Sequence, residues 1–409
     1  MMSYNAGVGL LGLIVSLSLL IILRVHLGIT LLASALVMGF LSLGLYGTLN
    51  VLLSTLTSYQ TLNLISITFL ILVLINLYRE SSYLSKLSER LRLLLKSSKS
   101  ILIVVPAILG LLPVIGGALM SAPIVDVEGE RLRLSSGRKI FINVWFRHIV
   151  MVVYPLNQAI ILTAILTETN LWSIIIRQIP IAIFMALIGF LISFHGLDKG
   201  ADSTLITDMN ETISTRFEAL IDFIKLFSPI LIAIILALVF KIKLALAVLL
   251  GVLVLIYLVR PNLKMMSNIF RDKVLYLTLL VAFSAILLRN IAIACDVSTI
   301  IASTIPQGTI PHILLLILLP LFLSALVGLA SSGIALAVPL LHGLLDISYK
   351  EASLIYISSY LGYLSSPTHL CLIVTAQYFK THITKGHRYL VPASILTLIF
   401  TIILYYIWP

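Results

Sequence analysis

Prolines and small residues in the first third of this chain recur in the last third at nearly constant spacing. Each half also carries a run of small residues and, further on, a polar break inside apolar sequence. Five positions have counterparts 212–216 residues later: Pro106, Gly117, Pro123, Pro155 and Pro180 correspond to Pro320, Gly333, Pro339, Pro367 and Pro392. The small-residue runs are GGALMSAP and SSGIALAVP, and the breaks are YPLNQ and SSPTH. In a membrane protein, two corresponding interrupted segments point to a transport site; glycines and prolines recurring by chance are the alternative.

The composition requires a membrane environment. The chain is 60% hydrophobic and only 11% charged, whereas a soluble domain is about 25% charged. Several apolar runs reach the roughly 20 residues that cross a bilayer as a helix, and the short alternating strands of a barrel do not occur. We therefore predict an all-α polytopic protein. Its net charge is +11. We interpret this charge as basic loops that set the orientation of the protein in the membrane and contact anionic lipid, rather than as a surface that binds nucleic acid.

We expect ten spanning helices and two shorter hairpins, each hairpin entering and leaving on one side. If the amino terminus is outside, 22 of the 27 Lys and Arg residues fall on the inside, as the positive-inside rule requires. This predicts a multi-pass protein of the cell membrane. The expected spans are 6–23, 28–46, 61–78, 141–167, 172–193, 223–240, 244–259, 273–290, 352–379 and 390–408, with hairpins near 100–125 and 311–345.

Each half has five true spans. Because five is an odd number, the second half starts on the opposite side of the membrane and should be inverted relative to the first. We expect a first repeat at 1–193, a polar cytoplasmic linker at 194–222 and a second repeat at 223–409. A further segment, 79–99, has leucines at helical spacing and predicts an amphipathic helix on the inner surface.

The hairpin turns supply the first group of candidate site residues. Small side chains let the backbone turn within the membrane and let its amides face a ligand. A short helix whose amino terminus lies at such a turn directs its free N–H groups at a bound anion. Close helix packing through small residues is the alternative. The candidates are Gly116, Gly117 and Ser121 in one half and Ser331, Ser332 and Gly333 in the other.

The polar breaks supply the second group. Proline removes one backbone donor and frees a carbonyl one turn earlier, so a break with polar neighbours can hold a cation or a polar solute. A proline kink satisfied by neighbouring helices is the alternative. Around Pro155 the candidates are Asn157 and Gln158, and around Pro367 they are Ser366, Thr368 and His369.

Ionisable residues inside spans are functional candidates by default. His369 is expected near the midplane, where it binds solute, carries a proton or serves only as a hydrogen-bonded structural group. Arg147 and His148 precede the first break by about two turns and are possible contacts for an anion, although Arg147 could instead extend to the interface. No Asp or Glu falls in the middle of a span, which disfavours a carboxylate proton relay.

The sequence does not indicate an enzyme. It contains no phosphate-binding loop, no GxSxG and no HExxH, which are the local patterns of nucleotide hydrolases, serine hydrolases and zinc proteases. It also lacks cysteine spacing typical of a metal site or disulfide framework. We expect no cofactor, with Na⁺ or H⁺ as the candidate coupling ions.

NVWFRHIV, GLLPVIGGALMSAP and SSPTHLCLIVT resemble an uncharacterised family of ten-span integral membrane proteins, over essentially the whole chain. That family is similar to the ion transporter superfamily, which includes gluconate permeases and citrate/dicarboxylate carriers. The resemblance implies inverted repeats, a re-entrant hairpin in each repeat, a dimerising scaffold and a transport domain that moves elevator-fashion. The carriers place Ser-Asn-Thr at both hairpin tips, whereas this chain has Gly-Gly-Ala and Ser-Ser-Gly, which leaves a dicarboxylate substrate and sodium coupling open.

We expect the protein to be a secondary transporter that carries a small organic solute across the lipid bilayer. The solute is expected to be an anion, and the transporter a homodimer. The alternatives are a channel whose filter is formed by the same breaks, and an intramembrane enzyme or lipid-handling protein that uses His369 or His148. Counter-transport of labelled solute favours the carrier, and single-channel currents favour the channel.

Overall fold

The computed structural model of the chain is helical. It describes residues 2–23, 25–81, 83–95, 97–111, 117–197, 213–296, 312–341, 345 and 347–408. The helices are α1 (Met2–Ile22), α2 (Leu27–Thr57), α3 (Tyr59–Glu80), α4 (Tyr83–Leu94), α5 (Ser98–Gly110), α6 (Ala118–Arg131), α7 (Ser136–Val153), α8 (Gln158–Leu166), α9 (Leu171–Phe194), α10 (Ile213–Leu238), α11 (Leu244–Val259), α12 (Leu263–Arg271), α13 (Lys273–Ala294), α15 (His312–Val327), α16 (Ala330–Leu341), α17 (Tyr349–Leu364), α18 (Leu370–Tyr378) and α19 (Thr384–Ile407).

Polar residues at the predicted turns begin many of these helices. A side-chain oxygen there accepts a hydrogen bond from a backbone N–H group that has no partner within its helix. Ser58 begins α3, Ser97 begins α5, Ser135 begins α7 and Asn170 begins α9 in this way. Ser348 begins α17 with a reciprocal capping box to Glu351.

The protein is a multi-pass membrane protein. Within the described residues, seven helical stretches are long and apolar enough to cross a bilayer. They are Leu27–Thr57, Tyr59–Glu80, Ser136–Leu166, Leu171–Phe194, Arg216–Leu238, Lys273–Ala294 and Thr384–Ile407. Large apolar side chains such as Leu45, Ile183 and Tyr257 are exposed on these and neighbouring helices, as expected of helices that lie in a membrane.

Two helical hairpins occupy the expected positions. α5 packs against α6, and α15 packs against α16. These helices contain 12 to 16 residues, so each is about 18–24 Å long and shorter than a bilayer core of about 30 Å. Residues 112–116, between α5 and α6 in the chain, lie outside the described residues, and Gly116 is among them. Entry and exit of each hairpin on one side remains a prediction.

Both predicted interruptions are confirmed. α7 ends at Val153 and α8 begins at Gln158, so Tyr154–Asn157 form a first non-helical link. α17 ends at Leu364 and α18 begins at Leu370, so Ser365–His369 form the second. Each expected long span is therefore two helices in series.

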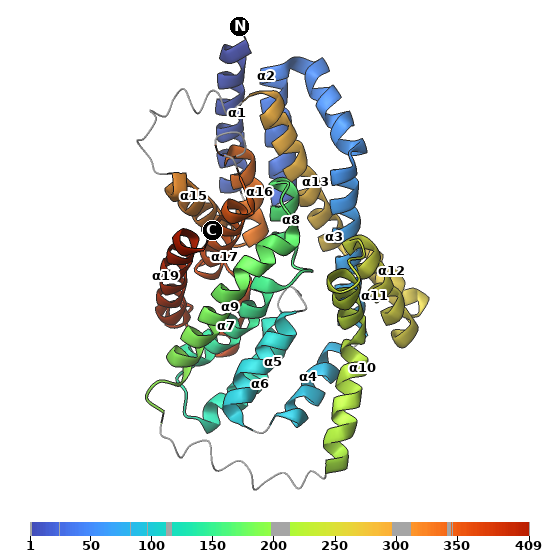
Figure 1. Cartoon of the computed structure of the whole chain (residues 1–409), viewed down its shortest axis with the longest axis vertical. Helices are drawn as coiled ribbons and strands as arrows, with labels where there is room; N and C mark the ends of the chain where they lie inside the picture. Colours follow the sequence, from blue (N-terminus) through green and yellow to red (C-terminus); the bar gives the residue numbers. More distant parts are fainter. Residues whose placement is uncertain are drawn as a thin grey trace.

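The hairpins pack crosswise between the two halves. α5 and α6 contact α7, and α15 and α16 contact α17, within their own halves. In addition, α6 contacts α18 and α16 contacts α8, so each hairpin lies on the second part of the other half's broken helix. Figure 1 shows the green helices α7 and α9 beside the red-brown helices α17 and α19. Both breaks are thus enclosed in one compact helical region.

Three elements differ from the sequence expectation. α2 continues past residue 46 to Thr57, with a kink at Gly44, whose φ of 71° suits a residue without Cβ. α12 was not predicted, because nine residues with two charges produce no spanning signal. α10 begins at Ile213, inside the segment expected to be a linker, of which residues 198–212 lie outside the described part.

The amphipathic helix expected at 79–99 is observed as α4, but its apolar stripe faces protein. Leu87 and Leu91 are buried, and α4 packs against α10 and α5. Arg90 also forms an ion pair with Asp222 of α10 at 3.1 Å. The stripe is therefore covered by the chain itself rather than by the membrane surface.

Candidate functional site

A cavity of about 430 Å³ lies where the first break and the second hairpin meet. Its polar wall contains Arg147, Asn157, Gln158, Ser331 and Ser332. Its apolar wall comes mainly from α3, α13 and the aromatic face of α17. A cavity of this size, with a few convergent polar groups on an apolar wall, is typical of a small-molecule site.

The first break is held open by Asn157. Pro155 lacks the N–H group that would bond the carbonyl of Met151 four residues earlier. Asn157 replaces this donor, because its Nδ2 donates to the Met151 carbonyl at 2.8 Å and the Tyr356 hydroxyl donates to the same oxygen at 3.1 Å. The Asn157 Oδ1 accepts from the Ala159 N–H group at 3.0 Å and caps α8. The break is thus a satisfied structure that directs the first turn of α8 at the cavity.

The second break is joined to the turn of the second hairpin. The Ser366 hydroxyl donates to the Ala325 carbonyl at 2.5 Å and accepts from the Thr368 N–H group at 3.1 Å. Gly328, at the hairpin turn, has a φ of 77°, and a Cβ built there would lie 2.8 Å from the Thr368 carbonyl oxygen. The hairpin therefore approaches the break so closely that only glycine fits.

Arg147 bridges α5 and the start of α6 from inside the protein. Its side chain is buried, at 2% exposure, so it does not extend to the membrane interface. Its Nη1 donates to the carbonyls of Leu109 at 3.0 Å and Gly117 at 3.2 Å. Because Arg147 also lines the cavity, one guanidinium group links the first hairpin to the site.

A buried asparagine absent from the sequence prediction joins the first hairpin to α18. Asn143 accepts from the Ser121 hydroxyl at 2.5 Å, and its Nδ2 donates to the Ala118 carbonyl at 2.9 Å and to the Thr375 hydroxyl at 2.9 Å. The available signal was an amide in an apolar helical run, one turn before Arg147. Ser121, a predicted site residue, is part of this buried connection.

Of the three predicted site residues in the second hairpin, two line the cavity and one packs against other helices. Ser331 and Ser332 line the cavity. Gly333 instead lies against other helices, because a Cβ there would lie 2.6 Å from the Ser359 hydroxyl and 2.8 Å from the Pro320 carbonyl. This matches the packing alternative for small residues.

Two polar atoms at the cavity have no hydrogen-bond partner among the described residues. They are Nε2 of Gln158 and Oγ of Ser332, and both residues line the cavity. A buried polar atom without a partner destabilises a protein by about 1–3 kcal/mol, so these atoms indicate where a bound ligand would be recognised.

The two predicted histidines lie together behind the cavity wall. The rings of His148 and His369 are 4.9 Å apart, edge to face, and both residues are buried. The Tyr363 hydroxyl is 3.0 Å from Nε2 of His148, and the Tyr363 ring packs against His369 with centroids 4.1 Å apart. The neighbouring Cys371 and Tyr363 line the cavity.

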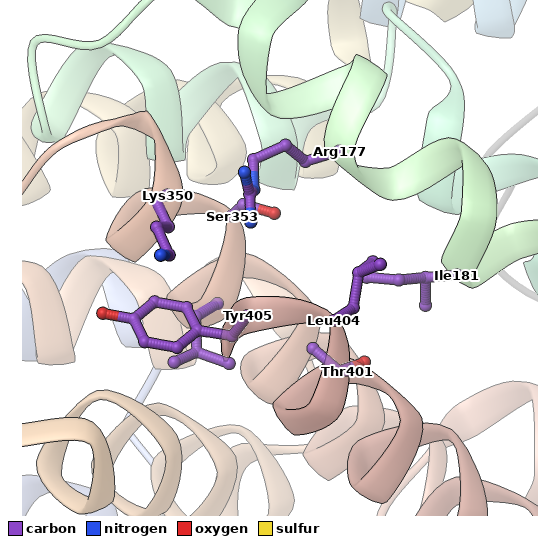
Figure 2. A pocket seen from close by; sticks show the side chains of 8 residues that line it. Arg177, Ile181, Lys350, Ser353, Thr401, Leu404 and Tyr405 are labelled. Atoms are coloured by element: carbon purple, nitrogen blue, oxygen red, sulfur yellow. The ribbon is translucent and has the colours of Figure 1, made fainter. Parts of the chain in front are cut away.

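A second pocket at the ends of α9, α17 and α19 is too small for a solute. Figure 2 shows Arg177, Lys350 and Tyr405 around it, and its volume is about 10 Å³, enough for roughly one water molecule. Arg177 donates to the Trp408 carbonyl at 2.8 Å. The basic residues here connect helix ends, and the larger cavity is the candidate site.

Comparison with known proteins identifies the family. The model of the family described as "Protein of unknown function (DUF401)" matches residues 7–408. The chain belongs to this family. No curated protein matches the chain.

The fold is shared with a solved transporter. The crystal structure of the Alcanivorax borkumensis YdaH transporter, described as having an unusual topology, is similar with a TM-score of 0.60 and 16% sequence identity. The similarity covers 96% of this chain and 98% of that one. At this identity the likeness establishes the fold of the DUF401 chain and leaves its activity to be argued from the site.

Proposed function

We propose that this DUF401 protein is a secondary transporter of a small organic anion. The observation that carries the proposal is the cavity bounded by a broken helix and a hairpin turn and lined by a buried arginine. Irregular backbone at membrane depth is tolerated only where it is buried in protein or lines a water-filled cavity, and transport sites are built from such discontinuous helices.

The chemistry of the wall favours an anion. α8 and α16 both begin at the cavity, since their first residues line it, and the amino terminus of a helix attracts negative charge. Arg147 adds a positive charge, and Gln158 and Ser332 add uncommitted polar atoms. Asp272 is the one acid among the described lining residues, and it pairs with Arg79 at 2.9 Å.

We also propose that the two halves are inverted repeats. The within-half and crosswise contacts of α5 to α9 have counterparts in those of α15 to α19. α1 begins at the upper end of the molecule and α10 at the lower end (Figure 1), as expected if these helices are counterparts of opposite orientation.

The proposed movement is elevator-like alternating access. The cavity extends to Arg79 and Asp272, which the positive-inside rule assigns to the cytoplasmic side. Near the opposite ends of α3 and α13, Arg289 of α13 pairs with Glu168 after α8 at 2.5 Å, and Gln60 of α3 donates to Glu168 at 3.1 Å. We interpret this arrangement as an inward-facing state. A homodimer in the plasma membrane and coupling to Na⁺ or H⁺ are further parts of the proposal.

The test is uptake into liposomes that contain the purified protein. Labelled citrate, succinate, gluconate and benzoate are offered with a Na⁺ gradient, a proton gradient or neither, after a thermal-stabilisation screen of the same anions. A bound ligand raises apparent stability by mass action. Counterflow of labelled against unlabelled anion supports a carrier, whereas single-channel currents without counterflow would replace the carrier by a channel.

Matched variants connect the activity to this cavity. Asn157→Leu and Ser332→Leu should abolish uptake, because each removes a polar group from the wall and fills space. Ser54→Leu, at an exposed position on α2, should retain uptake. Wild-type uptake in both cavity variants would remove this site from the mechanism.

A further inference from the structure

Three side chains with metal-ligating atoms meet at the cavity wall, where Cys371 lines the cavity and two histidines lie behind it. One ring nitrogen from each of His148 and His369 and the sulfur of Cys371 all lie within 4.8 Å of one another. His148 belongs to α7, while His369 and Cys371 lie at the start of α18. The group therefore joins the broken helices of the two halves.

His148 is held in the orientation of a metal ligand. Its Nδ1 is 2.6 Å from the Val144 carbonyl oxygen, which can only accept, so Nδ1 carries the proton. Nε2 then carries the free electron pair and accepts a hydrogen bond from the Tyr363 hydroxyl at 3.0 Å. A metal-ligating histidine is typically fixed in this way, by donation of its other N–H group to a carbonyl.

The environment of the His369 ring suggests that a ligand binds there. The His369 side chain is fully buried, and neither ring nitrogen makes a well-aligned hydrogen bond within the described part of the chain, although the ring interacts with the backbone of Leu364. Buried polar atoms are nearly always paired. A metal ion between the two rings and the thiol would supply the missing partner.

We propose that His148, His369 and Cys371 bind one Cu(I) ion. Thiolate ligands favour soft ions such as Cu(I), and imidazole also suits copper. Binding forms two Cu–N bonds and one Cu–S bond, breaks the S–H bond and releases one proton, with no change of oxidation state. The Tyr363 hydroxyl gives up its bond to Nε2.

The charge of the site favours Cu(I) over Zn²⁺. Cu(I) with one thiolate and two neutral imidazoles is electrically neutral, whereas Zn²⁺ would leave one positive charge. An uncompensated charge is costly in a buried site, and the adjacent residue, Arg147, already carries a buried positive charge. This inference goes beyond the proposed function and does not depend on transport.

The test titrates purified, reduced protein with Cu(I) supplied by a chromophoric chelator of known affinity under anaerobic conditions. We expect one tightly bound Cu(I) per chain, and X-ray absorption should show two nitrogen ligands and one sulfur ligand. Removal of a partner outside the ligand set already weakens metal binding 10–100-fold. Cys371→Ser and His369→Gln should therefore each weaken Cu(I) binding at least about 100-fold.

Matched controls separate this site from incidental binding. Cys295→Ser removes the chain's other cysteine, and His382→Gln removes an exposed histidine; both should bind Cu(I) as the wild type does. Tyr363→Phe removes the competing donor and should bind equally or more tightly. Size-exclusion profiles and melting temperatures establish that the variants are folded.

Three results would overturn the proposal: no stoichiometric Cu(I), unchanged affinity in folded Cys371→Ser, or displacement of Cu(I) by equimolar Zn²⁺. If the ligand variants do not fold, the absorption spectrum of wild type decides, because a copper spectrum without a sulfur ligand excludes Cys371.

Discussion

Gly328 joins the second hairpin turn to the second break, and its replacement by alanine measures that contact. A positive φ costs a residue other than glycine about 1–2 kcal/mol. Gly328 has a φ of 77°, and its added Cβ would also lie 2.8 Å from the Thr368 carbonyl oxygen. Overpacking of this kind costs about 1–3 kcal/mol more, so Gly328→Ala should destabilise the protein by about 2–5 kcal/mol.

Gly196→Ala is the matched control. Gly196 also follows a helix and has a φ of 73°, but nothing lies within 4 Å of its Cβ position, so this variant should lose only about 1–2 kcal/mol. For a chain of this length, 1 kcal/mol corresponds to about 2 °C or less in melting temperature. In thermal melts of detergent-purified protein, Gly328→Ala should fall by up to about 10 °C and Gly196→Ala by up to about 4 °C. Equal losses would refute the close contact between hairpin and break.

Three further substitutions test the hydrogen bonds around the site. Asn143→Ala should lower stability by at least about 2 kcal/mol, because several buried partners of one amide lose their bonds; a melting temperature within 1 °C of wild type would contradict this. Tyr356→Phe should lower stability by about 1 kcal/mol and reduce uptake, since its hydroxyl supports the first break, whereas exposed Tyr276→Phe should leave uptake unchanged. Arg147→Ala should reduce uptake at least tenfold, because it removes the buried positive charge beside the cavity and the Nη1 donor of both the Leu109 and Gly117 carbonyls; exposed Arg133→Ala is its control, and wild-type uptake by Arg147→Ala would exclude the guanidinium.

The features that could be predicted from sequence are those with local causes. Pro155 and Pro367 each remove a donor from their own helix, so both interruptions were predictable without knowledge of neighbouring helices. Asn157 follows its proline directly, and its role at the break is likewise local. Hairpin positions followed from small residues and from runs too short to span.

The missed features depend on partners that are distant in the chain. Tyr356 contacts Asn157 across 199 residues, and helix periodicity carries no information on which faces meet. Gly333 shows a related limit, since a small residue has the same sequence signature whether it faces a ligand or another helix. Gly44 could not be distinguished from the glycines that membrane helices carry freely.

The crosswise packing of the hairpins has a consequence for synthesis. Asn143 is made 232 residues before Thr375, to which it donates. At about 5–20 residues per second, roughly 10–50 s pass between the two. During this time the first hairpin lacks α18, its partner from the other half, and the Asn143 N–H group that will donate to Thr375 must find water or a temporary partner. Ribosome-bound chains that stop before α18 should therefore expose the face of the first hairpin and α7 that later packs against α18, and insertion factors or proteases should reach it. The region around the cavity is complete only after the last helices have been made.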